Sequence, residues 1–219
     1  MIGLDLVKPA DGALSILCLG AHSDDIEIGA GATVLELARR YPEARIAWHV
    51  FAGAGSRGEE ARASAEHFTR GYASANIAVH EFRDGYFPAQ LADLKPQLEA
   101  AKAASKPDVV LTHFRGDLHQ DHRTISDVTW QTFRDAFILE YEIAKYDGDL
   151  GAPNFFVPIS VDAYKEKLES LERFFGSQRS KDWFTADTFS ALMRLRGVEC
   201  RAASGYAEAF YVRKGVLAL

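Results

Sequence analysis

Short apolar runs alternate with longer amphipathic segments through the first part of the chain. Each apolar run is bounded by glycine, proline or polar residues, which is the pattern of a strand buried in a sheet. The segments between them repeat apolar residues three and four positions apart, which favours helices. The predicted strands cover residues 13–20, 44–53, 76–82 and 107–114, and the predicted helices cover 28–41, 56–71, 90–104 and 120–137.

Strand and helix alternate four times in this region. The alternation predicts an α/β fold of the three-layer Rossmann-like kind, in which a mostly parallel sheet carries helices on both faces. The rest of the chain is less regular. It predicts strands at 154–161 and 205–214, helices at 162–175 and 185–199, and a long loop at 140–156. The sequence shows no repeat, low-complexity tract or linker, so we expect residues 1–219 to form a single domain.

Composition and charge narrow the classes of function. The chain is 47% hydrophobic and 26% charged, as globular proteins are, and no apolar run is long enough for a membrane span. The net charge of −6 argues against nucleic acid as a partner. Cys18 and Cys200 form no metal-spaced pair, and the first residues lack the features of a secretory signal. We therefore expect a cytoplasmic protein with reduced thiols; the sequence leaves a homo-oligomer open.

The segment LGAHSDDIEIGAG, residues 19–31, places a histidine and two acids at the end of the first predicted strand. His22, Asp24 and Asp25 are compatible with a metal site. They are also compatible with a helix cap, because Ser and Asp are favoured at helix N-termini. The acids that separate Gly20 from the later glycines argue against a nucleotide-binding loop, since they would repel a pyrophosphate.

The segment THFRGDLHQDHRT, residues 112–124, follows the fourth predicted strand and holds His113, His119 and His122. Alone it is compatible with a polar turn into a helix. Histidine and aspartate are, however, the side chains that most often hold zinc or ferrous iron at catalytic sites. Both segments lie at the carboxyl ends of predicted strands, where parallel sheets bind ligands. If these strands are neighbours, one or more of these histidines completes a metal site with the first loop.

The two segments resemble the signatures of the PIG-L (LmbE-like) family of zinc-dependent deacetylases. AHSDDIEIGAG is similar to the family signature A-H-P-D-D-E-x-x-G-x-G, and THFRGDLHQDH is similar to the second signature, D-x-H-x-D-H after the fourth strand. Weaker similarities are R-x-x-E at 57–60, D-G at 84–85, RG at 196–197 and YAEAF at 206–210. Ser23 stands where the family usually has proline, which removes a stiffening element beside Asp24.

The resemblance implies an LmbE-like deacetylase domain with a bound Zn²⁺ ion. It implies a hydrolase that removes an N-acetyl group from an amino sugar, such as an N-acetylglucosamine that is free or carried on a nucleotide, lipid or glycan. The implied metal ligands are His22, Asp25 and His122. A zinc ion in such a site lowers the pKa of its water to about 7 and polarises the carbonyl, which is what amide hydrolysis at neutral pH needs.

The resemblance also implies roles for residues around the metal. Asp24 would be the general base on the attacking water, and His119, protonated, would stabilise the oxyanion or protonate the leaving amine. Asp121 would orient His119 from behind. Arg57 and Asp84 would contact sugar hydroxyls, although an i,i+3 ion pair on a helix explains Arg57 and a simple turn explains Asp84 equally well.

Three further expectations remain open at this stage. The loop 140–156 is rich in Tyr, Asp and Gly, so Tyr141, Tyr146 and Asp147 are candidates for contact with the substrate. Two histidines and one carboxylate also make the facial triad of non-haem Fe(II) enzymes, so Fe²⁺ is an alternative metal. A non-catalytic binding domain stabilised by metal would instead use four protein ligands, with His113 or His119 as the fourth.

Overall fold

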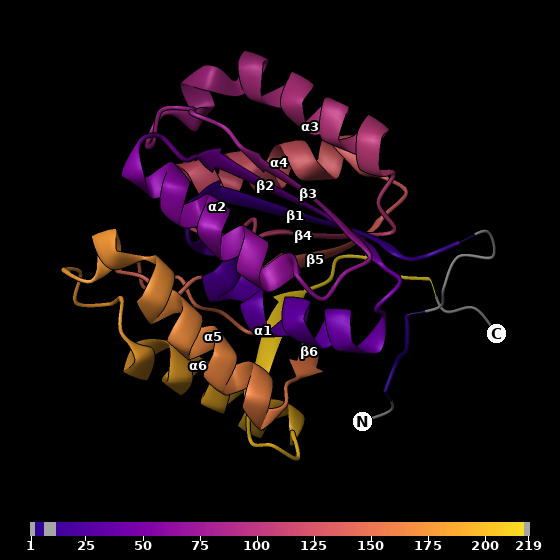
Figure 1. Ribbon diagram of the computed structural model, residues 1–219, viewed down its shortest axis with the longest axis vertical. Helices are drawn as coiled ribbons and strands as arrows, with labels where there is room; N and C mark the ends of the chain where they lie inside the picture. The colour runs from indigo at the N-terminus through magenta and orange to yellow at the C-terminus, as the bar shows by residue number, and fades with distance from the viewer. Residues whose placement is uncertain (1–2, 7–11, 217–219) are drawn as a thin grey trace.

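The computed structural model describes residues 3–6 and 12–216, and within these ranges the strands form one seven-stranded sheet. Its strand order is β3-β2-β1-β4-β5-β7-β6 (Figure 1). The strands are β1 (Ser15–His22), β2 (Arg45–Ala52), β3 (Ser74–Val79), β4 (Val109–His113), β5 (Phe137–Tyr141), β6 (Phe155–Pro158) and β7 (Ala207–Tyr211). Strands β1 to β5 run parallel, and β7 pairs antiparallel with β5 and β6. The predicted mostly parallel α/β sheet is confirmed.

Helices cover both faces of the sheet. They are α1 (Asp25–Arg40), α2 (Ser56–Thr69), α3 (Leu91–Ser105), α4 (Gln120–Thr132), α5 (Val161–Phe174) and α6 (Ala186–Cys200), with short 3-10 helices η1 (Phe87–Gln90) and η2 (Gly176–Gln178). Figure 1 shows α3 and α4 on one face and α1, α2, α5 and α6 on the other. None of these described helices is long and apolar enough to cross a membrane.

Each face of the sheet has its own apolar core. Successive side chains of a strand point to opposite faces, so a fully apolar strand fills both cores. In β1, Ile16 and Cys18 pack with residues of α1 and α2, whereas Leu17 and Leu19 pack with residues of α3 and α4. This double burial explains why β1 is an unbroken apolar run rather than an alternating one.

The order of the strands reverses between β1 and β4. The chain winds from β1 to β2 and β3 on one side, and α3 then carries it across the opposite face to β4 on the other side of β1. β1 and β4 pair directly, with Ile16 opposite Val109 and Cys18 opposite Leu111. Their carboxyl ends therefore open a crevice at the switch point, which is where open α/β sheets bind ligands.

Strand β5 corrects two sequence expectations. The helix predicted at 120–137 ends at Thr132, and Phe137–Tyr141 is a strand rather than part of a long loop. The apolar residues after Thr132 continue a helical spacing in sequence, but Ile138 and Leu139 are adjacent and fill opposite cores of the sheet. Pairing with β4 and β7 decides this segment, and such pairing is invisible to a local pattern.

Helix α1 lies unusually close to β5. A Cβ atom at Gly29 would stand 2.2 Å from Tyr141 Cδ2 and 2.6 Å from its Cγ. Tyr141 has no exposed surface, and its hydroxyl donates to the Leu19 carbonyl at 2.6 Å. The ring is therefore fixed and cannot move away from an added Cβ atom. The glycine lets α1 pack against the sheet, and this packing places the start of α1 at the crevice.

Candidate metal centre

The two polar loops meet at the crevice between β1 and β4. His22 is the last residue of β1, and Asp25 is the first residue of α1. His113 ends β4, and His122 lies in the first turn of α4. All four side chains are buried. Residues that are about one hundred positions apart in sequence thus face each other because β1 and β4 are neighbours.

Three donor atoms of these loops form a compact triangle. His22 Nδ1 lies 3.1 Å from His122 Nε2 and 3.3 Å from Asp25 Oδ2, and His122 Nε2 lies 3.5 Å from Asp25 Oδ2. A tetrahedral zinc ion with N and O ligands at its usual bond lengths separates ligand atoms by about 3.3–3.4 Å. The triangle therefore fits a zinc ion without rearrangement; we call it the donor triangle.

A carboxylate stands behind each histidine of the donor triangle. His22 Nε2 lies 3.3 Å from Asp121 Oδ2 and 3.1 Å from Asp84 Oδ1, and His122 Nδ1 lies 2.8 Å from Asp117 Oδ2. An imidazole that donates to a carboxylate through one nitrogen presents a lone pair at the other. The neutral form of each ring, with its proton towards the carboxylate, therefore has its lone pair directed into the triangle, as metal ligation requires.

The electrostatics of the site favour a cation. Burial alone would lower the pKa of His22, but the carboxylates of Asp25, Asp121 and Asp84 hold it well above its usual value. Burial alone would raise the pKa of Asp25, but the surrounding histidines, His122 first, hold it well below its usual range. Each group thus depends on a neighbouring opposite charge, and a divalent cation in the donor triangle would supply positive charge at the same point.

Asp121 does not orient His119 in the way we expected. Its carboxylate accepts the backbone N–H groups of Gly85 at 2.6 Å and Phe87 at 3.1 Å and faces His22. Only its backbone N–H contacts His119, donating to Nδ1 at 3.3 Å. The start of α4 turns the Asp121 side chain towards the β3–η1 loop, which no local pattern could indicate. Asp121 orients His22 instead.

His119 is half-buried at the edge of the donor triangle. Its ring centroid lies 4.8 Å from that of His22 and 4.7 Å from that of His122. Because Nδ1 accepts the Asp121 N–H, the ring carries its proton on Nε2. Burial first, and then the charges of His122 and His22, lower the pKa of His119. These effects favour a neutral ring with its N–H at Nε2 over the protonated group that we expected.

His113 is a poor fourth ligand. Its Nε2 accepts the Ala21 N–H at 2.9 Å, lies 3.2 Å from the Tyr141 hydroxyl, and is 3.3 Å from Asp25 Oδ2. The lone pair of Nε2 is thus already used inside the protein. Among the candidate ligands of the described chain, this favours three protein ligands and an open position over a closed, purely structural site.

The Asp24 carboxylate forms an ion pair with Arg57. Arg57 Nη2 donates to Asp24 Oδ1 at 3.1 Å, and Arg57 Nη1 lies 3.4 Å from Asp84 Oδ2. Burial first, and then Asp25, raise the pKa of Asp24, while Arg57 opposes the rise. His22 donates a hydrogen bond that, with Arg57, lowers the pKa of Asp84 to about 2. The structure brings all three predicted residues to the rim of the donor triangle.

The helix-cap interpretation does not describe the first loop. Asp24 occupies the N-cap position of α1, yet its side chain makes no capping hydrogen bond. Ser23, which replaces the family proline, is buried, and its hydroxyl lies 3.4 Å from the Ala52 carbonyl. With serine at this position the loop still presents Asp24 to Arg57 and Asp25 to the histidines.

The expected contact of Tyr141 with a substrate is wrong. Its side chain has no exposed surface and packs between α1 and β5, so a molecule entering from solvent cannot touch it. Tyr146 is 71% exposed and lies against Trp183, with ring centroids 6.4 Å apart. Asp147 lies 3.8 Å from Lys145. Of the three residues proposed from this loop, Tyr146 and Asp147 remain accessible.

Sequence reasoning left Asp117 and Lys145 without a role. Asp117 is the first residue of the D-x-H-x-D-H segment and contacts His122 directly. Lys145 comes from the loop after β5 and lies 3.1 Å from Asp117 Oδ1. The motif itself was the available signal for Asp117. Lys145 had none, because its contact depends on how the loop folds back over β4.

The first part of the chain matches a known protein family. A family model described as PIG-L, GlcNAc-PI de-N-acetylase, matches residues 17–133, from β1 to α4. No curated protein matches the chain.

Several solved structures share the architecture. GalB, the 4-carboxy-2-hydroxymuconate hydratase from Pseudomonas putida, is 17% identical with a TM-score of 0.77, covering 94% of this chain and 98% of that one. The N,N'-diacetylchitobiose deacetylase from Pyrococcus horikoshii is 20% identical with a TM-score of 0.69, covering 95% and 86%. The A40926 pseudoaglycone deacetylase Dbv21 is 18% identical with a TM-score of 0.70, covering 93% and 99%. At these identities the likeness establishes a shared fold.

The family match and the shared fold confirm the resemblance seen in the sequence. The match spans more than half of the chain and contains the first loop, Arg57, Asp84 and the second loop. The chain therefore belongs to the PIG-L family.

Proposed function

We propose that this chain is a metal-dependent hydrolase that removes the N-acetyl group of an amino sugar, in the cytoplasm. The observation that carries the proposal is the donor triangle with Asp24 and His119 at its rim. The family description, a GlcNAc-PI de-N-acetylase, and the deacetylases among the structural neighbours support an N-acetylated amino sugar as the substrate class. Both cysteines are free, as expected in a reducing compartment.

His22, Asp25 and His122 would hold the metal, with Zn²⁺ as the first candidate. When bound, zinc supplies a water that is acidic near neutral pH and a Lewis acid for the amide carbonyl. Fe²⁺ suits the same two histidines and carboxylate, so we keep it as the alternative ion. The carboxylates of Asp121 and Asp117 hold the two rings in the tautomer that ligation needs.

Asp24 is our candidate for the general base. It lies next to Asp25 in the chain, and burial makes its carboxylate more basic than usual. A base of this kind removes a proton from the attacking water as the water adds to the amide carbon. Arg57 opposes this rise in the pKa of Asp24 and fixes one of its carboxylate oxygens at 3.1 Å.

His119 is our candidate for the donor opposite the base. Its Nε2–H would donate to the developing oxyanion, while the Asp121 N–H holds the ring through Nδ1. Such preorganised donors typically contribute about 10²–10³-fold to the rate of acyl transfer. Arg57 and Asp84, joined at 3.4 Å at the partly exposed rim, are our candidates for contact with sugar hydroxyls.

The test combines metal content with release of free amine. The wild type, Asp24→Asn, and the control Asp93→Asn, an exposed acid in the first turn of α3, are loaded with zinc and assayed against N-acetylglucosamine derivatives. We expect about one zinc ion per chain in all three and an activity about 100-fold or more lower in Asp24→Asn alone. Absence of amine from the zinc-loaded wild type with every derivative would reject the deacetylase proposal.

Three further measurements on the same protein distinguish the competing functions. A hydratase shares this fold, and fold alone does not determine chemistry, so absorbance of an unsaturated carboxylic acid substrate is followed in parallel. Oxygen consumption by the Fe²⁺-loaded protein would identify an oxygenase. Binding of four protein ligands with no exchangeable water, measured by the spectrum of the Co²⁺ form, would identify a structural site.

A further inference from the structure

The second loop contains a buried carboxylate outside the proposed ligand set, Asp117, and the ammonium group of Lys145 contacts it. We propose that Asp117 and Lys145 are positioning residues: Asp117 orients His122 and His119 together, and Lys145 holds Asp117 in place from the loop 142–154. This inference rests on the proposed metal site and deepens it, because it names what sets the metal affinity of this particular chain.

Asp117 uses both of its carboxylate oxygens and is 2% exposed. Oδ2 lies 2.8 Å from His122 Nδ1, and Oδ1 accepts the backbone N–H of His119 at 2.7 Å. His119 is the N-cap of α4, the helix that carries His122 in its first turn. One carboxylate therefore fixes both a ring that faces the donor triangle and the backbone from which its helix starts.

Lys145 joins Asp117 to a different part of the chain. Its Nζ lies 3.1 Å from Asp117 Oδ1 and also pairs with Asp149, while the Lys145 side chain is only 8% exposed. Asp149 Oδ2 in turn accepts the backbone N–H of Leu118 at 2.7 Å. The loop 142–154 thus contacts the loop 114–119 at two points, the side chain of Asp117 and the backbone N–H of Leu118.

The contacts of Asp117 and Lys145 are expected to change the affinity of the site for a metal ion. Carboxylates behind a ligating histidine fix its tautomer and raise its basicity, and their loss typically weakens metal binding about 10–100-fold. A buried carboxylate that loses its cation is left uncompensated and turns towards other donors or water. Removal of Lys145 would therefore release Asp117, and with it the ring of His122.

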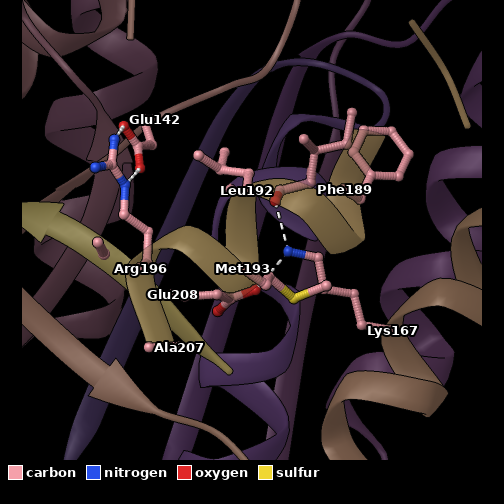
Figure 2. Close-up of a pocket in the computed structure, with 11 residues that line it drawn as sticks. Glu142, Lys167, Phe189, Leu192, Met193, Arg196, Ala207 and Glu208 are labelled. Atoms are coloured by element: carbon pink, nitrogen blue, oxygen red, sulfur yellow. Dashed lines mark hydrogen bonds and ion pairs between the residues drawn. The ribbon is translucent and has the colours of Figure 1, made fainter. Parts of the chain in front are cut away.

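A second buried ion pair provides a matched control. Figure 2 shows Lys167 beside Glu208, and the Lys167 Nζ donates to Glu208 Oε1 at 2.6 Å and to the Ile28 carbonyl at 2.7 Å. The pair lines a cavity of about 20 Å³ between α1, α6 and β7. Its contacts join α5 to α1 and β7, not to the histidines of the donor triangle. Lys167→Gln therefore removes a buried ammonium group without touching the proposed ligands.

The experiment measures zinc affinity by competition with a chromophoric chelator. It compares the wild type with Asp117→Asn, Lys145→Gln, Lys145→Arg and the control Lys167→Gln, and records the visible spectrum of each Co²⁺ form. We expect affinity to fall about 10–100-fold in Asp117→Asn and about 10-fold in Lys145→Gln, with an altered Co²⁺ spectrum, and to recover largely in Lys145→Arg. Lys167→Gln should lower the melting temperature and leave zinc affinity unchanged.

The outcomes are separable from those of the deacetylase test, because zinc affinity is measured without substrate. If folded Asp117→Asn and Lys145→Gln bind zinc as tightly as the wild type, the positioning proposal is wrong. It is equally wrong if Lys167→Gln weakens zinc binding as much as they do, since the effect would then be general loss of stability. If Lys145→Gln fails to fold, Asp117→Asn and Lys145→Arg decide. A wild type that binds zinc but releases no amine contradicts the proposed function only.

Discussion

Arg57→Gln removes the positive charge beside Asp24, the proposed general base. Arg57 Nη2 is 3.1 Å from Asp24 Oδ1, and the side chain of Asp24 is 5% exposed against 26% for Arg57. Burial and Asp25 raise the pKa of Asp24, and Arg57 counteracts them. Without Arg57 the pKa of Asp24 rises further, so the base becomes protonated, and inactive, at a higher pH than in the wild type.

The size of the effect follows from the geometry. Two unit charges 3.1 Å apart attract by about 5 kcal/mol at an effective dielectric constant of about 20, before the desolvation of both groups is subtracted. Carboxylates beside an arginine typically titrate about one to three pH units lower than without it. We therefore expect the acidic limb of the activity profile to move up by about one pH unit or more, which lowers kcat/KM about tenfold per unit on that limb.

The assay is kcat/KM for amine release from about pH 5 to about pH 9, at saturating zinc. Arg62→Gln, an exposed arginine on the same helix, is the control and should reproduce the wild-type profile. If Arg57→Gln lowers kcat/KM equally at every pH, Arg57 acts on the substrate only. The reasoning that links it to the ionisation of Asp24 would then be refuted.

Two further predictions concern the stability of the fold. Gly29→Ala places a Cβ atom 2.2 Å from the Tyr141 ring, and the resulting strain of about 1–3 kcal/mol outweighs the helix-propensity gain of about 1 kcal/mol. Urea unfolding should therefore show a lower free energy of unfolding for Gly29→Ala. The control Gly12→Ala, where a Cβ atom meets open space, should not be destabilised. Burial and His80 lower the pKa of His49 to about 4. Below about pH 6.5, His49 therefore binds a proton in the unfolded chain but stays neutral in the folded chain. Stability of the chelator-treated protein should therefore fall by about 2 kcal/mol from pH 7 to pH 5 because of this residue. An unchanged pH dependence in His49→Gln would contradict this.

Local patterns predicted the first four strand–helix units, apart from the end of the fourth helix, and the two candidate metal-binding segments. The apolar run that becomes β1 and the helical spacing after it are properties of neighbouring residues, and so is the cluster at His22, Asp24 and Asp25. Placement at strand ends then followed from the rule for parallel sheets. These patterns therefore indicated His22 and Asp25 as candidate ligands with one or more of the three histidines of the second loop, and the resemblance to the PIG-L family singled out His122.

Contacts between distant segments decided the rest. Phe137–Tyr141 became a strand because β4 and β7 pair with it, although its own spacing continues a helix. Tyr141 became a core residue because Gly29 lets α1 reach β5. In both cases the free energy comes from burial and pairing with residues far away in sequence, which local spacing does not record.

The same distinction explains which side chains surround the candidate metal site. The motif named Asp121 and His119 together, but the turn at the start of α4 points the carboxylate of Asp121 to His22 and to the N–H of Gly85. Asp117 and Lys145 come together only when the loop after β5 folds over the end of β4. Short sequence segments identify which residue types lie around the donor triangle, whereas the direction of each carboxylate depends on how helices, strands and loops pack together.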